Sequence, residues 1–87
     1  MAPYKVMLRI SVTKDLQGLP KKDAERIVKA INGLANGPRP PQARKLIGDT
    51  LCRLRCGVYR VLYEIQDNNR IVCVVGVWHR RGDFVRG

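Results

Sequence analysis

The sequence contains 87 residues, and its 17 lysines and arginines outnumber its 7 aspartates and glutamates, so the formal net charge is +10. Because 45% of the residues are hydrophobic, the chain can bury a modest core, which excludes a disordered basic tail and favours one globular domain over residues 1–87. The charge leaves two interpretations open, a surface that binds a polyanion and a surface that only keeps the protein soluble.

The first half of the chain predicts one strand followed by two helices. Residues Tyr4 to Ile10 mix β-branched and large apolar residues with two cations, as half-exposed strands do. A short helix is expected to start at residues 13–16 and to stop near Gly18. A longer helix follows Pro20, because apolar residues recur at helical spacing until Gly37-Pro38 ends it. Its apolar positions are Ala24, Ile27, Val28, Ile31, Leu34 and Ala35.

The second half of the chain predicts a loop and then three strands. Residues 37–41, with three prolines among them, cannot form regular structure. Three runs rich in Val, Ile, Leu and Tyr follow at Leu51–Cys56, Val58–Gln66 and Ile71–His79, and residues 67–69 predict a turn between the last two. This order predicts an α+β domain, with the first strand and two helices packed on a mostly antiparallel four-stranded sheet.

Arginines alternate with apolar residues in the predicted strand 51–56. This alternation places Arg53 and Arg55 on one face of the strand and the apolar side chains on the other. If residues 57–58 form a two-residue turn with glycine at its first position, Arg55 lies directly opposite Arg60 on the next strand. Three arginines are then expected to share one face of the sheet.

Such a face needs an explanation, because like charges directly across a sheet repel each other and only Glu64 is expected nearby. A bound phosphate would remove the repulsion, since the planar guanidinium group matches phosphate oxygens. The distribution of basic residues agrees with a phosphate site in the second half of the chain. Residues 44–87 hold eight of the eleven arginines, while residues 1–43 hold five of the six lysines. The alternative is a solvated face whose arginines extend into water.

Short motifs are spread over nearly the whole chain in one characteristic order. They are Lys14-Asp15-Leu16, Leu19-Pro20, the long helix ending at Pro38, Lys45-Leu46-Ile47-Gly48, Arg53-Leu54-Arg55, Gly57-Val58-Tyr59-Arg60-Val61-Leu62-Tyr63-Glu64-Ile65 and His79-Arg80-Arg81. In this order the chain resembles the RelE/ParE toxin superfamily, and within it the RelE branch of bacterial or archaeal toxin–antitoxin systems.

The resemblance implies a function. RelE toxins of type II toxin–antitoxin systems are ribosome-dependent endoribonucleases, which cleave mRNA in the ribosomal A site, inhibit translation and arrest growth. The implied partners are therefore the ribosome with its rRNA, mRNA, and a RelB-like antitoxin that neutralises the toxin. An acidic or amphipathic antitoxin segment would suit so basic a surface.

The resemblance also implies which residues act. Cleavage of this type uses the ribose 2′-hydroxyl as nucleophile and requires stabilisation of the negative charge that develops on the phosphorane. Four arginines match the family's basic catalytic positions; they are Arg53, Arg55, Arg60 and Arg80. Substrate binding is expected of Lys45, Arg81 and Phe84.

Proton transfer is the open part of this interpretation. The family often has a catalytic tyrosine after the last strand, where this chain has Phe84, which can stack on a base but cannot transfer a proton. His79 is the only conventional proton-transfer side chain and could take over that role. The alternative is that His79 merely ends the strand, and Asp83 and Glu64 are weaker candidates.

The other large aromatic residues are interpreted as packing residues. Tyr59 and Tyr63 share the strand parity of Val61 and Ile65, which places all four on the core side of the sheet. Trp78 lies in a very apolar strand, so packing is favoured over a role as a platform for a stacked base.

No feature of the sequence predicts export, a membrane or a bound metal. Two cations in residues 1–12 interrupt the apolar core that a signal peptide needs, and the longest apolar run, Ile71–Trp78, is too short to span a bilayer, so a cytoplasmic protein is expected. Cys52 and Cys56 lie too far apart along one strand for a disulfide. Because His79 has no partner at metal-ligand spacing, no metal or other cofactor is expected.

Two other functions remain open. A ParE-like toxin would inhibit DNA gyrase and cut nothing itself, although that branch does not need a row of phosphate-binding arginines. A non-catalytic nucleic-acid-binding relative is the other alternative, and the replacement of tyrosine by Phe84 is compatible with it.

Overall fold

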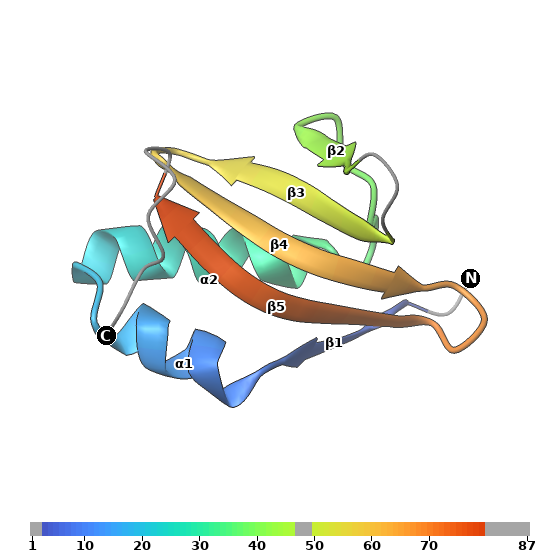
Figure 1. Cartoon of the computed structure of the whole chain (residues 1–87), viewed down its shortest axis with the longest axis horizontal. Coiled ribbons are helices and arrows are strands. Elements are labelled where there is room, and N and C mark those ends of the chain that lie inside the picture. Colours follow the sequence, from blue (N-terminus) through green and yellow to red (C-terminus); the bar gives the residue numbers. More distant parts are fainter. Residues whose placement is uncertain (1–2, 47–49, 80–87) are drawn as a thin grey trace.

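The computed structural model describes residues 3–46 and 50–79, which form a five-stranded sheet with two helices against one of its faces (Figure 1). The elements are β1 (Lys5–Leu8), α1 (Ile10–Gln17), α2 (Lys21–Gly33), β2 (Ala43–Lys45), β3 (Leu51–Cys56), β4 (Tyr59–Gln66) and β5 (Ile71–His79). The strand order is β1-β5-β4-β3-β2, with β1 parallel to β5 and every other pair antiparallel. The predicted α+β class is confirmed, with five strands instead of four.

The additional strand is β2, at the edge of the sheet. Its three residues pair with β3, so that Ala43 lies opposite Leu54, Arg44 opposite Arg53, and Lys45 opposite Cys52. A three-residue strand with two cations shows no alternation of polar and apolar residues, and it follows a proline-rich loop. The sequence pattern therefore could not distinguish it from that loop.

Both helices differ in extent from the prediction. α1 begins at Ile10, three residues earlier than expected, and the Arg9 carbonyl accepts hydrogen bonds from the amides of Val12 and Thr13 at 3.0 and 3.3 Å. The β-branched residues Ile10 and Val12 made this segment look like strand. α2 ends at Gly33, after which hydrogen-bonded turns continue through Asn36.

The core lies between the helices and the sheet. α1 contributes Val12 and Leu16, and α2 contributes Ile27 and Ile31, whose spacing puts each pair on one helix face. The buried strand residues are Cys52, Leu54, Cys56, Val61, Tyr63, Val72, Val74 and Val77. Burying one aliphatic or aromatic side chain contributes about 1.5–3 kcal/mol, so this layer accounts for the packing of both helices.

Tyr63 is fully buried, as the sequence predicted, and its hydroxyl donates a hydrogen bond to the Pro38 carbonyl at 2.7 Å. This bond satisfies the polar atom inside the core and fixes the loop after α2 to the centre of the sheet. Burial raises the pKa of Tyr63 to about 12.

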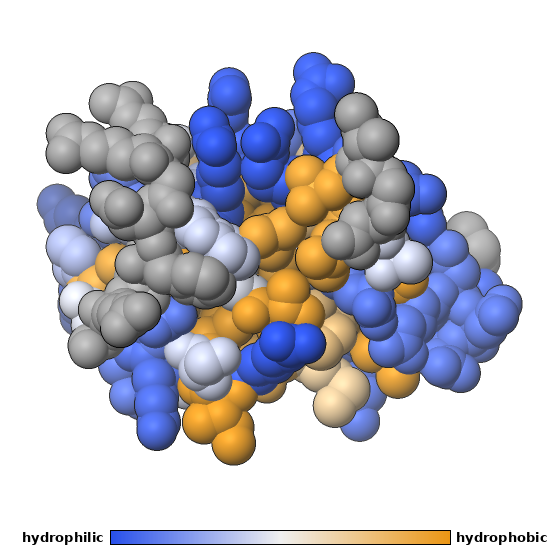
Figure 2. All heavy atoms as spheres, in the orientation of Figure 1, coloured by the Kyte–Doolittle hydropathy of each residue, from blue (hydrophilic) through white to orange (hydrophobic). Residues whose placement is uncertain are grey.

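The second face of the sheet is covered by neither α1 nor α2; α2 passes behind the strands in Figure 1. Figure 2 shows this uncovered face, with apolar side chains at its centre and hydrophilic side chains along its upper border. Strand register places Leu62 and Cys73 here, on β4 and β5. Neither helix of the described residues is long and apolar enough to cross a membrane.

Candidate functional site

The hairpin between β3 and β4 places three arginines on the uncovered face. Gly57 has a φ of +60°, as the first position of the predicted two-residue turn requires, and Arg55 lies directly opposite Arg60. Arg53 lies two residues before Arg55 on the same face, opposite Leu62. The predicted register and the shared face of these arginines are confirmed.

The structure adds a fourth arginine to the row. Because Arg44 of β2 lies directly opposite Arg53, its side chain projects from the same face. The sequence interpretation missed Arg44 because it contained no strand at residues 43–45. We call the four side chains of Arg44, Arg53, Arg55 and Arg60 the arginine face.

Two hollows lie along the arginine face. One of about 240 Å³ is lined by Arg55, Gly57, Tyr59 and Arg60, and one of about 140 Å³ by Pro41, Gln42, Arg44, Arg53 and Arg55. Arg55, whose side chain is exposed, borders both of them. Each hollow exceeds the roughly 30 Å³ that one water occupies in the liquid, so an anion can lie between guanidinium groups.

Within residues 3–46 and 50–79, no ion pair or side-chain hydrogen bond compensates the four arginines. The nearest acid on this face, Glu64, accepts hydrogen bonds from Gln66 Nε2 at 3.0 Å and from Thr50 Oγ1 at 3.4 Å. The ion pair in this part of the chain joins Arg39 to Asp67, on other elements. Four guanidinium groups with no acidic partner in this part of the chain give the face a positive potential, which attracts anions.

Trp78 lies directly opposite Arg60, on the arginine face. This position results from a β-bulge: the register shifts by one residue between Leu62 and Tyr63, which leaves Val75 of β5 without a partner on β4. Val77 consequently faces the core, and the partly buried Trp78 faces the arginines. The sequence interpretation treated Trp78 as a packing residue and did not place it in the site.

His79 lies on the opposite, helix-covered side. It is paired with Tyr59, and the two rings meet edge to face with their centroids 5.6 Å apart. The Tyr59 hydroxyl in turn donates a hydrogen bond to Asp23 Oδ2 of α2 at 3.2 Å. Burial, followed by the charge of Asp23, raises the pKa of Tyr59. The structure thus brings His79 together with α2 and not with the arginine face.

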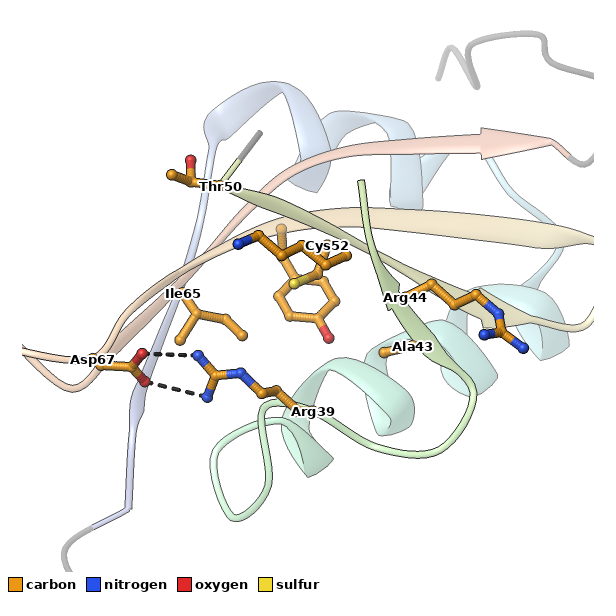
Figure 3. A pocket seen from close by; sticks show the side chains of 9 residues that line it. Arg39, Ala43, Arg44, Thr50, Cys52, Ile65 and Asp67 are labelled. Atoms are coloured by element: carbon orange, nitrogen blue, oxygen red, sulfur yellow. Dashed lines mark hydrogen bonds and ion pairs between the residues drawn. The ribbon is translucent and has the colours of Figure 1, made fainter. Parts of the chain in front are cut away.

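Lys45 also faces away from the arginine face, because it is paired with Cys52. It lines a cavity of about 420 Å³ at the open end of the core, whose other walls include Ile65 and the Arg39–Asp67 ion pair (Figure 3). Three further site residues from the sequence interpretation lie outside the described residues; they are Arg80, Arg81 and Phe84.

Comparisons with known proteins find relatives over most of the chain. Residues 6–84 match the family described as ParE toxin of type II toxin–antitoxin system, parDE. Toxin RelE of Mycobacterium tuberculosis (strain ATCC 25618 / H37Rv) is 34% identical over 86 residues, which cover 94% of this chain and 87% of that protein.

Solved structures of relatives have the same fold. The crystal structure of the archaeal RelE–RelB complex from Pyrococcus horikoshii OT3 contains a chain that superposes with a TM-score of 0.82 at 30% identity, covering 90% of this chain and 96% of that one. The toxin–antitoxin complex RelBE2 from Mycobacterium tuberculosis gives a TM-score of 0.79 at 28% identity, covering 90% and 99%. The chain therefore belongs to the RelE/ParE superfamily and is a toxin of a type II toxin–antitoxin system.

Proposed function

We propose that this toxin is a ribosome-dependent endoribonuclease that cleaves mRNA in the ribosomal A site and so inhibits translation. The arginine face carries the proposal: its four guanidinium groups, which have no acidic partner within residues 3–46 and 50–79, lie on one face and match the phosphates of an RNA strand. The relatives named RelE support the RelE branch of the superfamily, to which ribosome-dependent nucleases belong. Because translating ribosomes are its target, the proposed place of action is the cytoplasm.

In the proposed reaction, the ribose 2′-oxygen attacks the adjacent phosphorus, its proton is removed, and the bond to the 5′-oxygen breaks as that oxygen takes up a proton. The products are a 2′,3′-cyclic phosphate and a 5′-hydroxyl end. Arg55 and Arg60, opposite each other, would bind the phosphoryl oxygens and stabilise the negative charge of the phosphorane. Guanidinium groups stay protonated near neutral pH, so these residues supply charge and position and do not act as the base.

Arg80, Arg81 and Phe84 remain part of the proposal by their place after β5, and Lys45 by its position beside Arg44. Arg80 would add a fourth catalytic guanidinium to Arg53, Arg55 and Arg60. Lys45, Arg81 and Phe84 would bind the RNA away from the scissile phosphate.

The proposed partner that neutralises the toxin is a RelB-like antitoxin. The relatives from P. horikoshii and M. tuberculosis were crystallised with their antitoxins. The net charge of +10 favours an acidic antitoxin segment, since opposite charges speed the association of two proteins.

Gyrase inhibition is the second candidate function, because the family that matches residues 6–84 is the ParE toxin family. A ParE-like toxin would block supercoiling by purified DNA gyrase and leave ribosome-bound mRNA intact. The arginine face favours the nuclease, since inhibition of a protein target does not require four phosphate-binding side chains in one row.

The decisive experiment is expression of the toxin from a tightly controlled promoter, followed by primer extension on a translated message. We expect growth arrest with new mRNA ends at A-site codons. Arg60→Ala should reduce cleavage by about 10²-fold or more, since it removes a donor to the developing charge. Lys22→Ala, which removes one charge from the exposed face of α2, is the matched control and should cleave normally. Growth arrest without new mRNA ends would contradict the proposal, and inhibition of gyrase in its place would establish the second candidate.

A further inference from the structure

We propose that Trp78 is a base-stacking residue, which holds a nucleobase of the RNA strand beside the phosphate bound by Arg60. The inference rests on the proposed function and deepens it. It assigns to the arginine face an aromatic side chain that binds the base part of the substrate.

Trp78 is the aromatic neighbour of Arg60 in the sheet. Register places it directly across from Arg60, on a strand about 4.8 Å away. Arg55 follows on the other side of Arg60, so one aromatic residue and two arginines occupy neighbouring positions on one face across three strands. Each nucleotide of a single RNA strand carries one phosphate and one base, and proteins that hold such strands combine cationic and aromatic side chains in this way.

Trp78 does not belong to the buried core cluster. Its neighbour Val77 is fully buried in the core cluster on the helix-covered face, and Trp78 projects from the other face. Neither α1 nor α2 covers that face (Figure 1). Its ring is nevertheless partly buried, which restricts its orientation and lowers the entropy lost on stacking.

A structural role is the competing explanation. Gly76 lies two residues away on the same face and is buried, so the indole could serve to shield the backbone there. The two explanations differ in what they predict for RNA. A shielding residue affects stability alone, whereas a stacking residue makes affinity depend on the presence of a base.

Trp78 is the only tryptophan of the chain, which allows a direct test. The full-length toxin is titrated at low salt with a labelled single-stranded 2′-deoxy oligonucleotide, and with an abasic strand of the same length and charge. Anisotropy of the label measures binding, and tryptophan emission reports contact with a base. We expect the strand with bases to quench tryptophan emission and to bind at least about 10-fold more tightly than the abasic strand. The abasic strand should bind without quenching. Equal affinities, unchanged emission on binding, or no binding of either strand would overturn the inference.

Variants separate stacking from shielding. Trp78→Phe keeps an aromatic face, whereas Trp78→Leu keeps apolar bulk without one. We expect Trp78→Leu to lose the preference for bases and to raise KM for ribosome-bound mRNA by about 10-fold. Trp78→Phe should keep most of the preference for bases and a KM close to that of the wild type. A Trp78→Leu protein with a lowered melting temperature and an unchanged base preference would show that the indole only shields the backbone.

The proposed function and this inference fail in different ways. If the wild-type toxin cuts mRNA and Trp78→Leu cuts it with the same KM, the stacking role is wrong and the nuclease stands. If the wild-type toxin cuts no mRNA, the nuclease is wrong, and the comparison of the two oligonucleotides still decides whether Trp78 stacks.

Discussion

Val75 determines which side chain lies beside Arg60. Gln66 pairs with Ile71 at one end of the β4–β5 ladder, and an unbroken ladder from there would pair Arg60 with Val77. His79 would then project from the arginine face and Trp78 from the other. The bulge at Val75 reverses both orientations. The sequence could not reveal this, because residues 71–78 are apolar throughout apart from one glycine, and they show no alternation from which a face could be read.

His79→Ala tests the acid–base role that the sequence suggested. From the placement of His79 against Tyr59, we expect its loss to slow cleavage by less than about 10-fold, whereas removal of a general acid or base costs about 10²–10⁴-fold. The lost ring contact should instead lower stability, by about 0.5–1.5 kcal/mol. Single-turnover cleavage of ribosome-bound mRNA and thermal melting measure the two effects.

The control for His79→Ala is His79→Phe, which keeps an aromatic ring against Tyr59 and removes the titratable nitrogens. It should melt near the wild-type temperature and cleave normally. A 10²-fold loss in both variants, with the acid or alkaline limb of the pH–rate profile removed, would establish His79 as the proton-transfer group.

Among the strands, the β3–β4 hairpin could be predicted from the sequence and β2 could not. The hairpin is encoded locally: Gly57 starts a two-residue turn, and alternation on either side of it fixes the register that pairs Arg55 with Arg60. β2 forms only because β3 offers a free edge to residues 43–45, and their own pattern does not show it. For this reason the sequence located three of the four arginines and missed Arg44.

Gly57→Ala should destabilise the hairpin and with it the arginine face. A side chain at a φ of +60° costs about 1–2 kcal/mol, and a Cβ there would lie 2.9 Å from Arg26 Nη1, which the flexible arginine can relieve by moving. We expect a loss of about 1–2 kcal/mol in the free energy of unfolding, measured by urea denaturation.

Gly37→Ala is the matched control for the turn, because an added Cβ meets nothing within 4 Å there and the residue has no positive φ. It should leave stability unchanged or raise it by up to about 1 kcal/mol through the unfolded state. Equal effects of the two substitutions would show that the turn does not require glycine.

A network of three side chains joins segments that are far apart in the chain. Asp67, in the turn between β4 and β5, forms a two-point ion pair with Arg39 of the loop after α2 and accepts a hydrogen bond from the Tyr4 hydroxyl before β1. No sequence pattern indicates this network, since Arg39 and Tyr4 lie 28 and 63 residues from Asp67. The composition of the chain establishes its net charge, but it does not show which charged side chains pair with one another.

This network predicts how stability depends on pH. The hydrogen bonds from Arg39 and then from Tyr4 hold the pKa of Asp67 below its ordinary value of 3.8. A carboxyl group with a lowered pKa in the folded state stabilises the protein above the ordinary value, and this stabilisation is lost as the pH falls through the lowered one. We therefore expect Asp67→Asn to melt below the wild type at pH 7, and the difference in melting temperature to shrink below about pH 4.

Asp15→Asn supplies the control, because it removes the same charge from α1, away from the network. The difference in melting temperature between Asp15→Asn and the wild type should not shrink below about pH 4 in the way expected for Asp67→Asn. Tyr4→Phe should retain most of the pH dependence, because the two bonds from Arg39 remain. If Asp67→Asn keeps a constant difference from the wild type between pH 2 and 7, the Asp67 carboxylate does not hold these three segments together. The link between the N-terminal strand and the β4–β5 turn must then depend on other contacts, such as the β1–β5 pairing and the hydrogen bond from the Lys5 amide to the Arg70 carbonyl.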